Sequence, residues 1–241
     1  MGRNACANFA VRTLAYQGLE KEDIRYLTSD TQLDLDNDGV PDEVISPSAA
    51  NLQTAVEWAK DADMLVLYMV NHGGKDDNGK GFFRLSSSET LSAAQLDAWL
   101  DAFQQNSLCK VTVIYDACKS GTFLTELTAP EGKERIVITG TSPDEDALFI
   151  SQGTNSFSLY FWTNIFNGTD VQSAFLHTRK TGYAASQHRQ SHDDRKQREG
   201  LFGNGSILCR RFWLIYARLR TMRSMRALKQ RRSDDDGIAR V

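Results

Sequence analysis

The sequence has few cysteines and no long apolar run. Its four cysteines, Cys6, Cys109, Cys118 and Cys209, are widely separated and show no CxxC spacing, so we expect neither a zinc site nor a disulfide framework. No apolar stretch approaches the ~18 residues of a transmembrane helix, and no basic and apolar signal peptide stands at the start. These absences leave an ordinary globular chain whose cysteines need another explanation.

Net charge is also small, −3, but its distribution is uneven. Residues 1–185 hold 14 Lys and Arg against 25 Asp and Glu, whereas residues 186–241 hold 14 against 6. A basic tail of this kind is compatible with binding to nucleic acid or to a membrane surface. However, arginine dominates this tail, and the tail contains no clear helix caps or turn residues. Its local sequence pattern therefore does not agree with the fold predicted for the rest of the chain. We therefore favour a reading-frame shift or a tail without selected structure, and do not expect it to bind nucleic acid or membranes.

The remaining 185 residues can form a single domain with an ordinary core, since 41% of the chain is hydrophobic. Continuous apolar runs at 64–70, 111–115 and 136–139 predict strands buried on both faces of a parallel sheet. Helices are predicted over 4–18, within 46–60, within 91–105 behind Ser92 as a cap, over 156–166 and over 169–184. This alternation predicts an α/β fold whose strands are parallel neighbours.

Two reactive side chains follow two of these strands. His72 comes just after the run 64–70, and Cys118 just after 111–115. In an open α/β sheet, ligands bind beyond the carboxyl ends of the strands. The shared position favours a functional pair over a core cysteine and an unrelated His-Gly turn, although each residue alone fits the simpler explanation.

A cysteine and a histidine in this arrangement can carry out acyl transfer. The thiolate is the attacking species, and an imidazole can take the thiol proton and later protonate the leaving amine. Backbone N–H groups must then stabilise the oxyanion. Gly73 and Gly74 allow the backbone close to a substrate, and the N–H of Cys118 is a natural second donor.

The stretches "NHGG" (71–74) and "YDACKSGTF" (115–123) resemble the His-Gly and Ala-Cys-x-Ser-Gly motifs of legumain-like cysteine peptidases of the bacterial and archaeal type. The resemblance extends over roughly residues 4–185. It implies the caspase–haemoglobinase fold, a three-layer α/β/α sandwich with a mostly parallel central sheet. It also implies a cysteine endopeptidase acting on a peptide or protein substrate through an acyl-enzyme, with no cofactor needed for the chemistry.

The same resemblance assigns roles to individual residues. His72 is expected to be the general base and Cys118 the nucleophile, and Gly73 helps to form the oxyanion hole. Asp116 occupies an acidic or amide position of the family, where substrate contact and a structural hydrogen bond are both open. The strand after the nucleophile lines the primary specificity pocket, which makes Thr141, Ser142 and Asp144 candidates for substrate binding, with a plain polar turn as the alternative. Legumains prefer asparagine and caspases aspartate before the cleaved bond, and both stay open.

An acidic loop, "DLDNDGVPDE" (34–43), has the ligand spacing of a calcium site. Alternate carboxylates and a carbonyl converge on the ion, while Gly39 permits the sharp turn. Ile45 replaces the glutamate that closes an EF-hand, so a solvated acidic turn is the alternative. We expect a structural Ca²⁺ with five ligands: Asp34, Asp36, Asp38, Val40 and Asp42.

The resemblance has two departures. Family members begin with a strand before the first helix, so it implies that this chain lacks that strand. The basic tail replaces an expected acidic, Asp/Asn/Gly-rich segment. An inactive caspase-like binding module and a calcium-binding cell-surface domain are therefore alternatives to the peptidase. The calcium loop and the family favour an extracytoplasmic setting.

Overall fold

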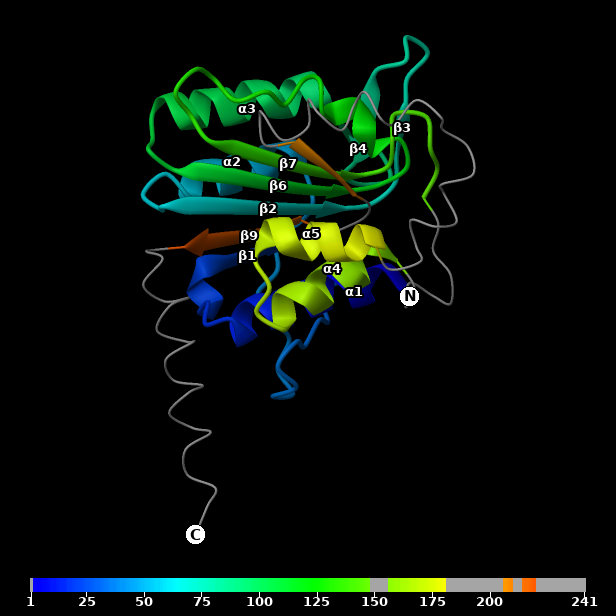
Figure 1. Ribbon diagram of the computed structural model, residues 1–241. Helices are drawn as coiled ribbons and strands as arrows, with labels where there is room; N and C mark the ends of the chain where they lie inside the picture. Colours follow the sequence, from blue (N-terminus) through cyan, green and yellow to red (C-terminus); the bar gives the residue numbers. More distant parts are fainter. Residues whose placement is uncertain (1, 148–155, 181–205, 210–213, 220–241) are drawn as a thin grey trace.

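Three parallel strands form the centre of the structure. The computed structural model describes residues 2–147, 156–180, 206–209 and 214–219. In it β2 (Met64–Val70) pairs with β6 (Lys110–Asp116), and β6 pairs with β7 (Arg135–Gly140), all in parallel. Nearly every residue of β2 and β6 is buried, as their continuous apolar sequence predicts. The predicted α/β fold with a mostly parallel sheet is confirmed (Figure 1).

Three further strands complete this sheet, in the order β1-β9-β2-β6-β7-β8. The strand β8 (Ser206–Cys209) lies parallel to β7, and β9 (Leu214–Leu219) lies antiparallel between β1 (Ile24–Leu27) and β2. Both of these last two strands, β8 and β9, belong to residues 186–241. The facing edges of β1 and β2 present backbone groups that need partners, and the apolar segment that forms β9 supplies them. The rest of residues 186–241 lies outside the described residues.

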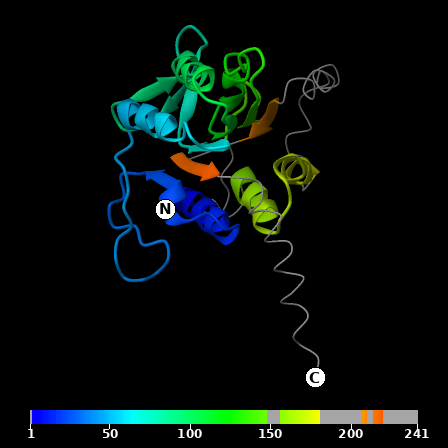
Figure 2. The same cartoon turned by 90° about the vertical axis from the view of Figure 1, so that its left-hand side faces the viewer.

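Helices cover both faces of the sheet (Figures 1 and 2). On one side lie α2 (Ala49–Trp58) and α3 (Ala93–Gln105), and on the other α1 (Gly2–Tyr16), α4 (Phe157–Phe166) and α5 (Val171–Lys180). The hydroxyls of Ser48, Ser92 and Ser156 accept a backbone N–H bond at the start of α2, α3 and α4. The predicted helices are thus present, with residues 181–184 of the last one outside the described residues.

A second, smaller sheet follows β2 directly. It consists of β3 (Gly73–Lys75), β4 (Gly81–Arg84) and β5 (Thr90–Ser92), paired antiparallel in that order. Tyr115 of β6 connects the two sheets, because its hydroxyl donates to the carbonyl oxygen of Phe82 at 3.2 Å and its ring lies edge-on to Phe83. The small sheet therefore fixes the chain that leaves the carboxyl end of β2.

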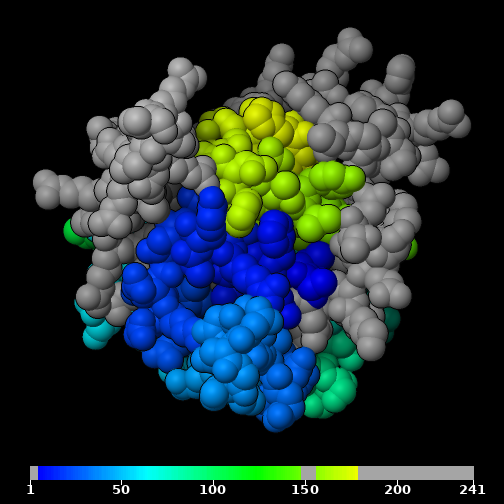
Figure 3. Space-filling model, turned by 90° about the horizontal axis from the view of Figure 1, so that it is seen from below, coloured from blue at the N-terminus to red at the C-terminus, as the bar shows by residue number. Residues whose placement is uncertain are grey.

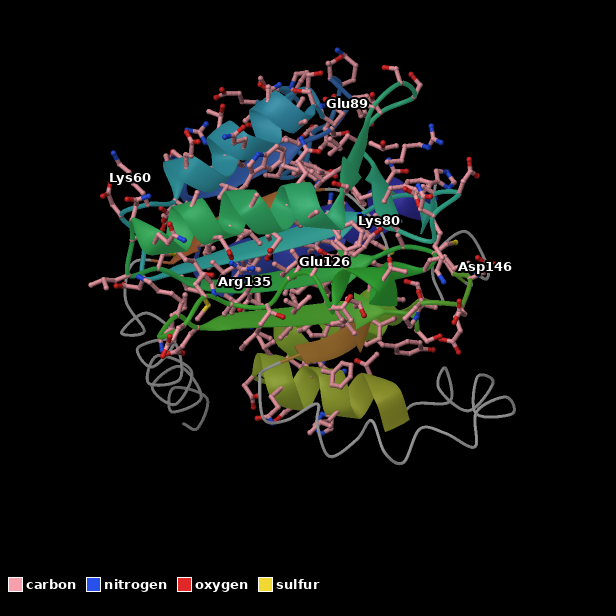
Figure 4. All side chains as sticks on the ribbon, turned by 90° about the horizontal axis from the view of Figure 1, so that it is seen from above. Lys60, Lys80, Glu89, Glu126, Arg135 and Asp146 are labelled. Atoms are coloured by element: carbon pink, nitrogen blue, oxygen red, sulfur yellow. The ribbon has the colours of Figure 1, made fainter. Side chains whose placement is uncertain are left out.

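A buried arginine fastens α3 to the sheet. The guanidinium of Arg135, at the start of β7, is fully buried and bonds to Asp97 at 2.8 Å and to Asp101 at 2.7 Å, one helical turn apart on α3. Its Nε also donates to the Gln104 side chain at 2.9 Å. Figure 4 shows Arg135 beneath this helix. The charge is therefore compensated where water does not reach it.

Within the described residues, no helix combines the length and the apolar character needed to cross a membrane.

Candidate active site at the carboxyl edge of the sheet

His72 leaves the end of β2 on a backbone that is held on both sides. The side chain of Asn71 accepts a hydrogen bond from the His72 N–H at 2.6 Å and donates to the carbonyl oxygen of Arg84. The Arg84 N–H in turn donates to the His72 carbonyl oxygen at 2.8 Å. Asn71 and β4 thus fix the main chain of His72, whose half-buried side chain lies at the edge where ligands bind in such sheets.

Cys118 lies in a tight turn, residues 117–119, that follows β6. Lys119 adopts the left-handed conformation with φ 60°, which is uncommon for a residue with a side chain, and the short helix η2 (Ser120–Phe123) begins after it. The thiol is half-buried, and its sulfur accepts a hydrogen bond from the N–H of Ala147 at 3.3 Å. We call residues 117–119 the Cys118 turn.

The structure brings the histidine segment and the Cys118 turn into direct contact. The strands that carry them end in register, with Val70 opposite Asp116. A Cβ atom built on Gly73 would lie 2.5 Å from the Cys118 carbonyl oxygen and 2.7 Å from the Ala117 Cβ. Only a residue without a side chain fits this approach. His72, Gly73 and Cys118 therefore meet at one edge of the molecule.

Asp116 is the last residue of β6 and therefore lies at this edge of the sheet. It is fully buried, and its negative charge adds to the effect of burial in raising the pKa of Cys6 in α1, to about 11, and of Tyr68 in β2. Tyr68 itself packs edge-on against Trp162 of α4 at 5.1 Å between ring centroids. Because β6 ends at Asp116, the alternation of side chains along a strand does not place Cys118 on the same face as Asp116. Burial of this kind suits a structural role, and contact of Asp116 with substrate stays a prediction.

The three expected pocket residues follow β7 and differ in their environment. Thr141 is buried, and its hydroxyl donates to the Ala117 carbonyl oxygen at 3.0 Å, which ties the end of β7 to the Cys118 turn. Ser142 is half-buried, and its N–H donates to the Glu145 carboxylate at 3.0 Å. Asp144 is largely exposed and pairs with Lys75 at 2.6 Å, and this ammonium lowers the pKa of the carboxyl. All three lie beside the turn, and their contact with substrate stays a prediction.

Ser120 was not expected at this site, although it belongs to the sequence motif. Its buried hydroxyl accepts the N–H groups of Gly140 at 2.9 Å and of Thr141 at 3.0 Å. The next residue, Gly121, approaches the same strand end so closely that a Cβ would lie 2.4 Å from the Thr141 carbonyl oxygen. The serine and the glycine of the motif therefore serve to join the ends of β6 and β7.

The acidic loop lies apart from this edge, at the surface beside α1 (Figure 3, light blue). Carboxylate oxygens of Asp34, Asp36 and Asp42 lie within 4.8 Å of one another, whereas Asp38 is outside this group and accepts the N–H of Val40 at 2.8 Å. The ammonium of Lys21 bonds to Asp36 at 2.6 Å and to Asp42 at 2.9 Å, which lowers the pKa of Asp36 and raises that of Lys21. Three of the five expected ligands therefore converge, with a lysine beside them.

One family model matches the chain. It describes the Peptidase C13 family and covers residues 43–199, which include both ends of the site, His72 and Cys118. No curated protein gives a significant match.

Proposed function

Since the chain belongs to the Peptidase C13 family, the legumain family of cysteine peptidases, we propose that it is an endopeptidase that uses Cys118 and His72 as a dyad. Family membership supports cysteine peptidase activity on peptide or protein substrates in general. The proximity of Gly73 to the Cys118 turn is the observation that supports this particular pair, because it brings the segment of His72 against that of Cys118.

The proposed reaction has two halves. His72 takes the thiol proton, and the sulfur of Cys118 attacks the scissile carbonyl carbon, whose π electrons move to its oxygen. The N–H groups of Gly73 and Cys118 stabilise this oxyanion. The C–N bond then breaks, and the imidazolium gives its proton to the leaving amine. Water, deprotonated by His72, attacks the acyl-enzyme, which releases the carboxylic acid and the free thiol.

The specificity pocket belongs to this proposal. Thr141, Ser142 and Asp144 follow the strand next to the nucleophile and are candidates to line it, and Asp116 remains a candidate only through a rearrangement that exposes it, since it is fully buried. The residue before the cut bond will identify the pocket's preference.

A peptide-library digest tests the dyad. We expect turnover by the purified chain, loss of about 10³-fold or more in Cys118→Ala and in His72→Ala, and unchanged turnover in two matched controls. His177→Ala removes an exposed histidine on α5, and Cys109→Ala removes a buried cysteine that precedes the start of β6. Absence of cleavage by folded protein would support a binding module instead.

We also propose that the acidic loop binds a structural Ca²⁺. Oxygen ligands suit this ion, and three converging carboxylates in a short loop with glycine at its turn give it a fitting donor set. Asp38 and the Val40 carbonyl would complete the coordination after a local adjustment, and the ion would displace the ammonium of Lys21. Its role would be to brace the loop, since the site lies apart from the dyad. A bound calcium would also suit the extracytoplasmic setting.

A further inference from the structure

The segment 142–147 runs alongside the Cys118 turn. The N–H of Lys119 donates to the Glu145 carbonyl oxygen at 2.9 Å, and the N–H of Ala147 donates to the sulfur of Cys118 at 3.3 Å. At its first residues the segment lies against Gly121, where a Cβ would come within 2.7 Å of the Pro143 nitrogen. The backbone of this segment thus follows the turn and ends with a donor on the thiol.

Two lysines hold the segment in this position. The ammonium of Lys75, on β3, bonds to the Asp144 carboxylate at 2.6 Å. The ammonium of Lys119 bonds to the Asp144 carbonyl oxygen at 2.6 Å and to the Asp146 carboxylate at 3.3 Å. Figure 4 shows Asp146 at the outer edge of the molecule.

The lysine side chains of these ion pairs are more buried than the aspartate side chains. The lysine side chains are only 29% and 26% exposed, whereas those of Asp144 and Asp146 are 88% and 74% exposed. The lysine stems therefore pack against the protein and present their ammonium groups to a segment that is otherwise open to water. A single exposed ion pair contributes little, but here two lysines bond to Asp144 and Asp146 of the same short segment.

We propose that Lys75 and Lys119 are positioning residues, which clamp the segment 142–147 against the Cys118 turn and so keep the Ala147 N–H on the sulfur. This inference rests on the proposed function, because it takes Cys118 as the nucleophile. The thiolate is the form that attacks. A backbone N–H that bonds to the sulfur favours this thiolate over the thiol. The lysines act through the segment and not by touching the substrate.

The left-handed backbone of Lys119 fits this role. A glycine adopts φ 60° without strain, whereas a lysine does so at a cost in free energy. The conformation places the Lys119 N–H on Glu145 and its side chain along the same segment. The strained backbone of Lys119 therefore fits a position where the lysine side chain is needed to hold the segment 142–147.

Alkylation of Cys118 by iodoacetamide tests the clamp without any peptide substrate. The rate is followed as a function of pH by mass spectrometry of the Cys118 peptide, so that the plateau at high pH reports access and the midpoint reports ionisation. We expect Lys75→Met/Lys119→Met to move the midpoint to higher pH and to lower kcat by about tenfold, with a smaller change in KM. Of the other titratable groups at this edge, His72, Tyr115 and Glu145 are unchanged in this variant, whereas the carboxylates of Asp144 and Asp146 lose their lysine partners.

Two controls accompany the double variant. Lys119→Arg keeps the positive charge and should restore the profile, which a loss of folding would not allow. Lys110→Met breaks an ion pair with Glu134 of the same 2.6 Å length away from the site and should change nothing. A variant that acts on the donor directly is Ala147→Pro, which lacks the N–H and should reproduce the double variant, whereas Ala147→Ser should not.

An unmoved midpoint in both the double variant and Ala147→Pro would overturn the clamp. If the wild-type chain cleaves peptides in a Cys118-dependent way while the midpoint stays, the clamp fails and the proposed function stands. If the chain cleaves nothing but the midpoint moves as expected, the clamp stands and the peptidase proposal fails.

Discussion

Gly73 and Cys118 lie against each other so closely that a Cβ at position 73 would come within 2.5 Å of the Cys118 carbonyl oxygen. Gly73 also approaches the hydroxyl of Tyr115, at 2.6 Å from the same Cβ position. This contact joins the end of β2 to the end of β6 without any intervening side chain. The histidine and the cysteine segments therefore hold each other in place.

The variant Gly73→Ala tests this contact. Because the added methyl group meets the Cys118 carbonyl oxygen, the Tyr115 hydroxyl and the Ala117 Cβ, the two segments must separate. We expect kcat/KM to fall by about 100-fold and the free energy of unfolding to fall by about 1–3 kcal/mol. Gly132→Ala is the control, since Gly132 has φ 74° and open space around its Cβ position. It should lose about 1 kcal/mol of stability and keep full turnover. Equal activity in both variants would contradict the proposed geometry.

The hydroxyl of Ser120 stabilises the same edge by joining the ends of β6 and β7. Ser120→Ala leaves the half-buried N–H of Gly140 and the buried N–H of Thr141 without their acceptor. We expect the free energy of unfolding in urea to fall by about 2 kcal/mol or more. Ser88→Ala, at an exposed hydroxyl, should lie within about 0.5 kcal/mol of the wild type. A Ser120→Ala chain as stable as this control would show that the strand ends need no such tie.

The sequence predicts the central sheet well, because its signals are local. The apolar runs 64–70 and 111–115 match β2 and β6 almost residue for residue, and Ser92 caps α3 as expected. Both motif residues, His72 and Cys118, follow strands that the apolar pattern already defines. Their meeting at one edge follows from the parallel arrangement alone.

Other features depend on contacts between distant parts of the chain. The strand β3 is only three residues long and contains Gly73 and Gly74, so no propensity marks it, and its pairing with β4 decides its conformation. The strand β9 joins β1 and β2 from almost the other end of the chain. Lys75 is separated from Asp144 by 69 positions, and no spacing rule connects the two.

Asp170 gives a prediction for pH dependence. Its carboxylate accepts the N–H of Ser173 at 2.9 Å in the first turn of α5, and this bond lowers the pKa of the carboxyl. A carboxyl whose pKa is lower in the folded chain than in the unfolded chain stabilises the fold at a pH above its unfolded pKa. This stabilisation is lost as the pH falls through the pKa of the folded chain. We expect Asp170→Ala to lose about 1 kcal/mol at neutral pH and progressively less below about pH 4. A loss that is the same at neutral and at strongly acidic pH would contradict this.

Thermal unfolding with and without Ca²⁺ tests the acidic loop. A ligand that binds only the folded chain raises Tm, so we expect millimolar calcium to raise it in the wild type and to have no effect in Asp34→Asn. Lys21→Met should bind calcium more tightly, because it removes the competing ammonium from Asp36 and Asp42. Asp61→Asn, at an exposed aspartate elsewhere, is the control. A wild-type Tm that is insensitive to calcium would exclude the site.

The most direct measurement is the capture of the acyl-enzyme. The chain is mixed with peptidyl p-nitrophenyl esters that carry asparagine or aspartate next to the ester, quenched in acid and analysed by intact mass and by peptide mapping. We predict one added acyl group on Cys118, a burst of nitrophenol of about one equivalent, and loss of both in Cys118→Ala, with a much slower burst in His72→Ala. Acylation at another residue, or an unchanged burst without His72, would contradict the dyad.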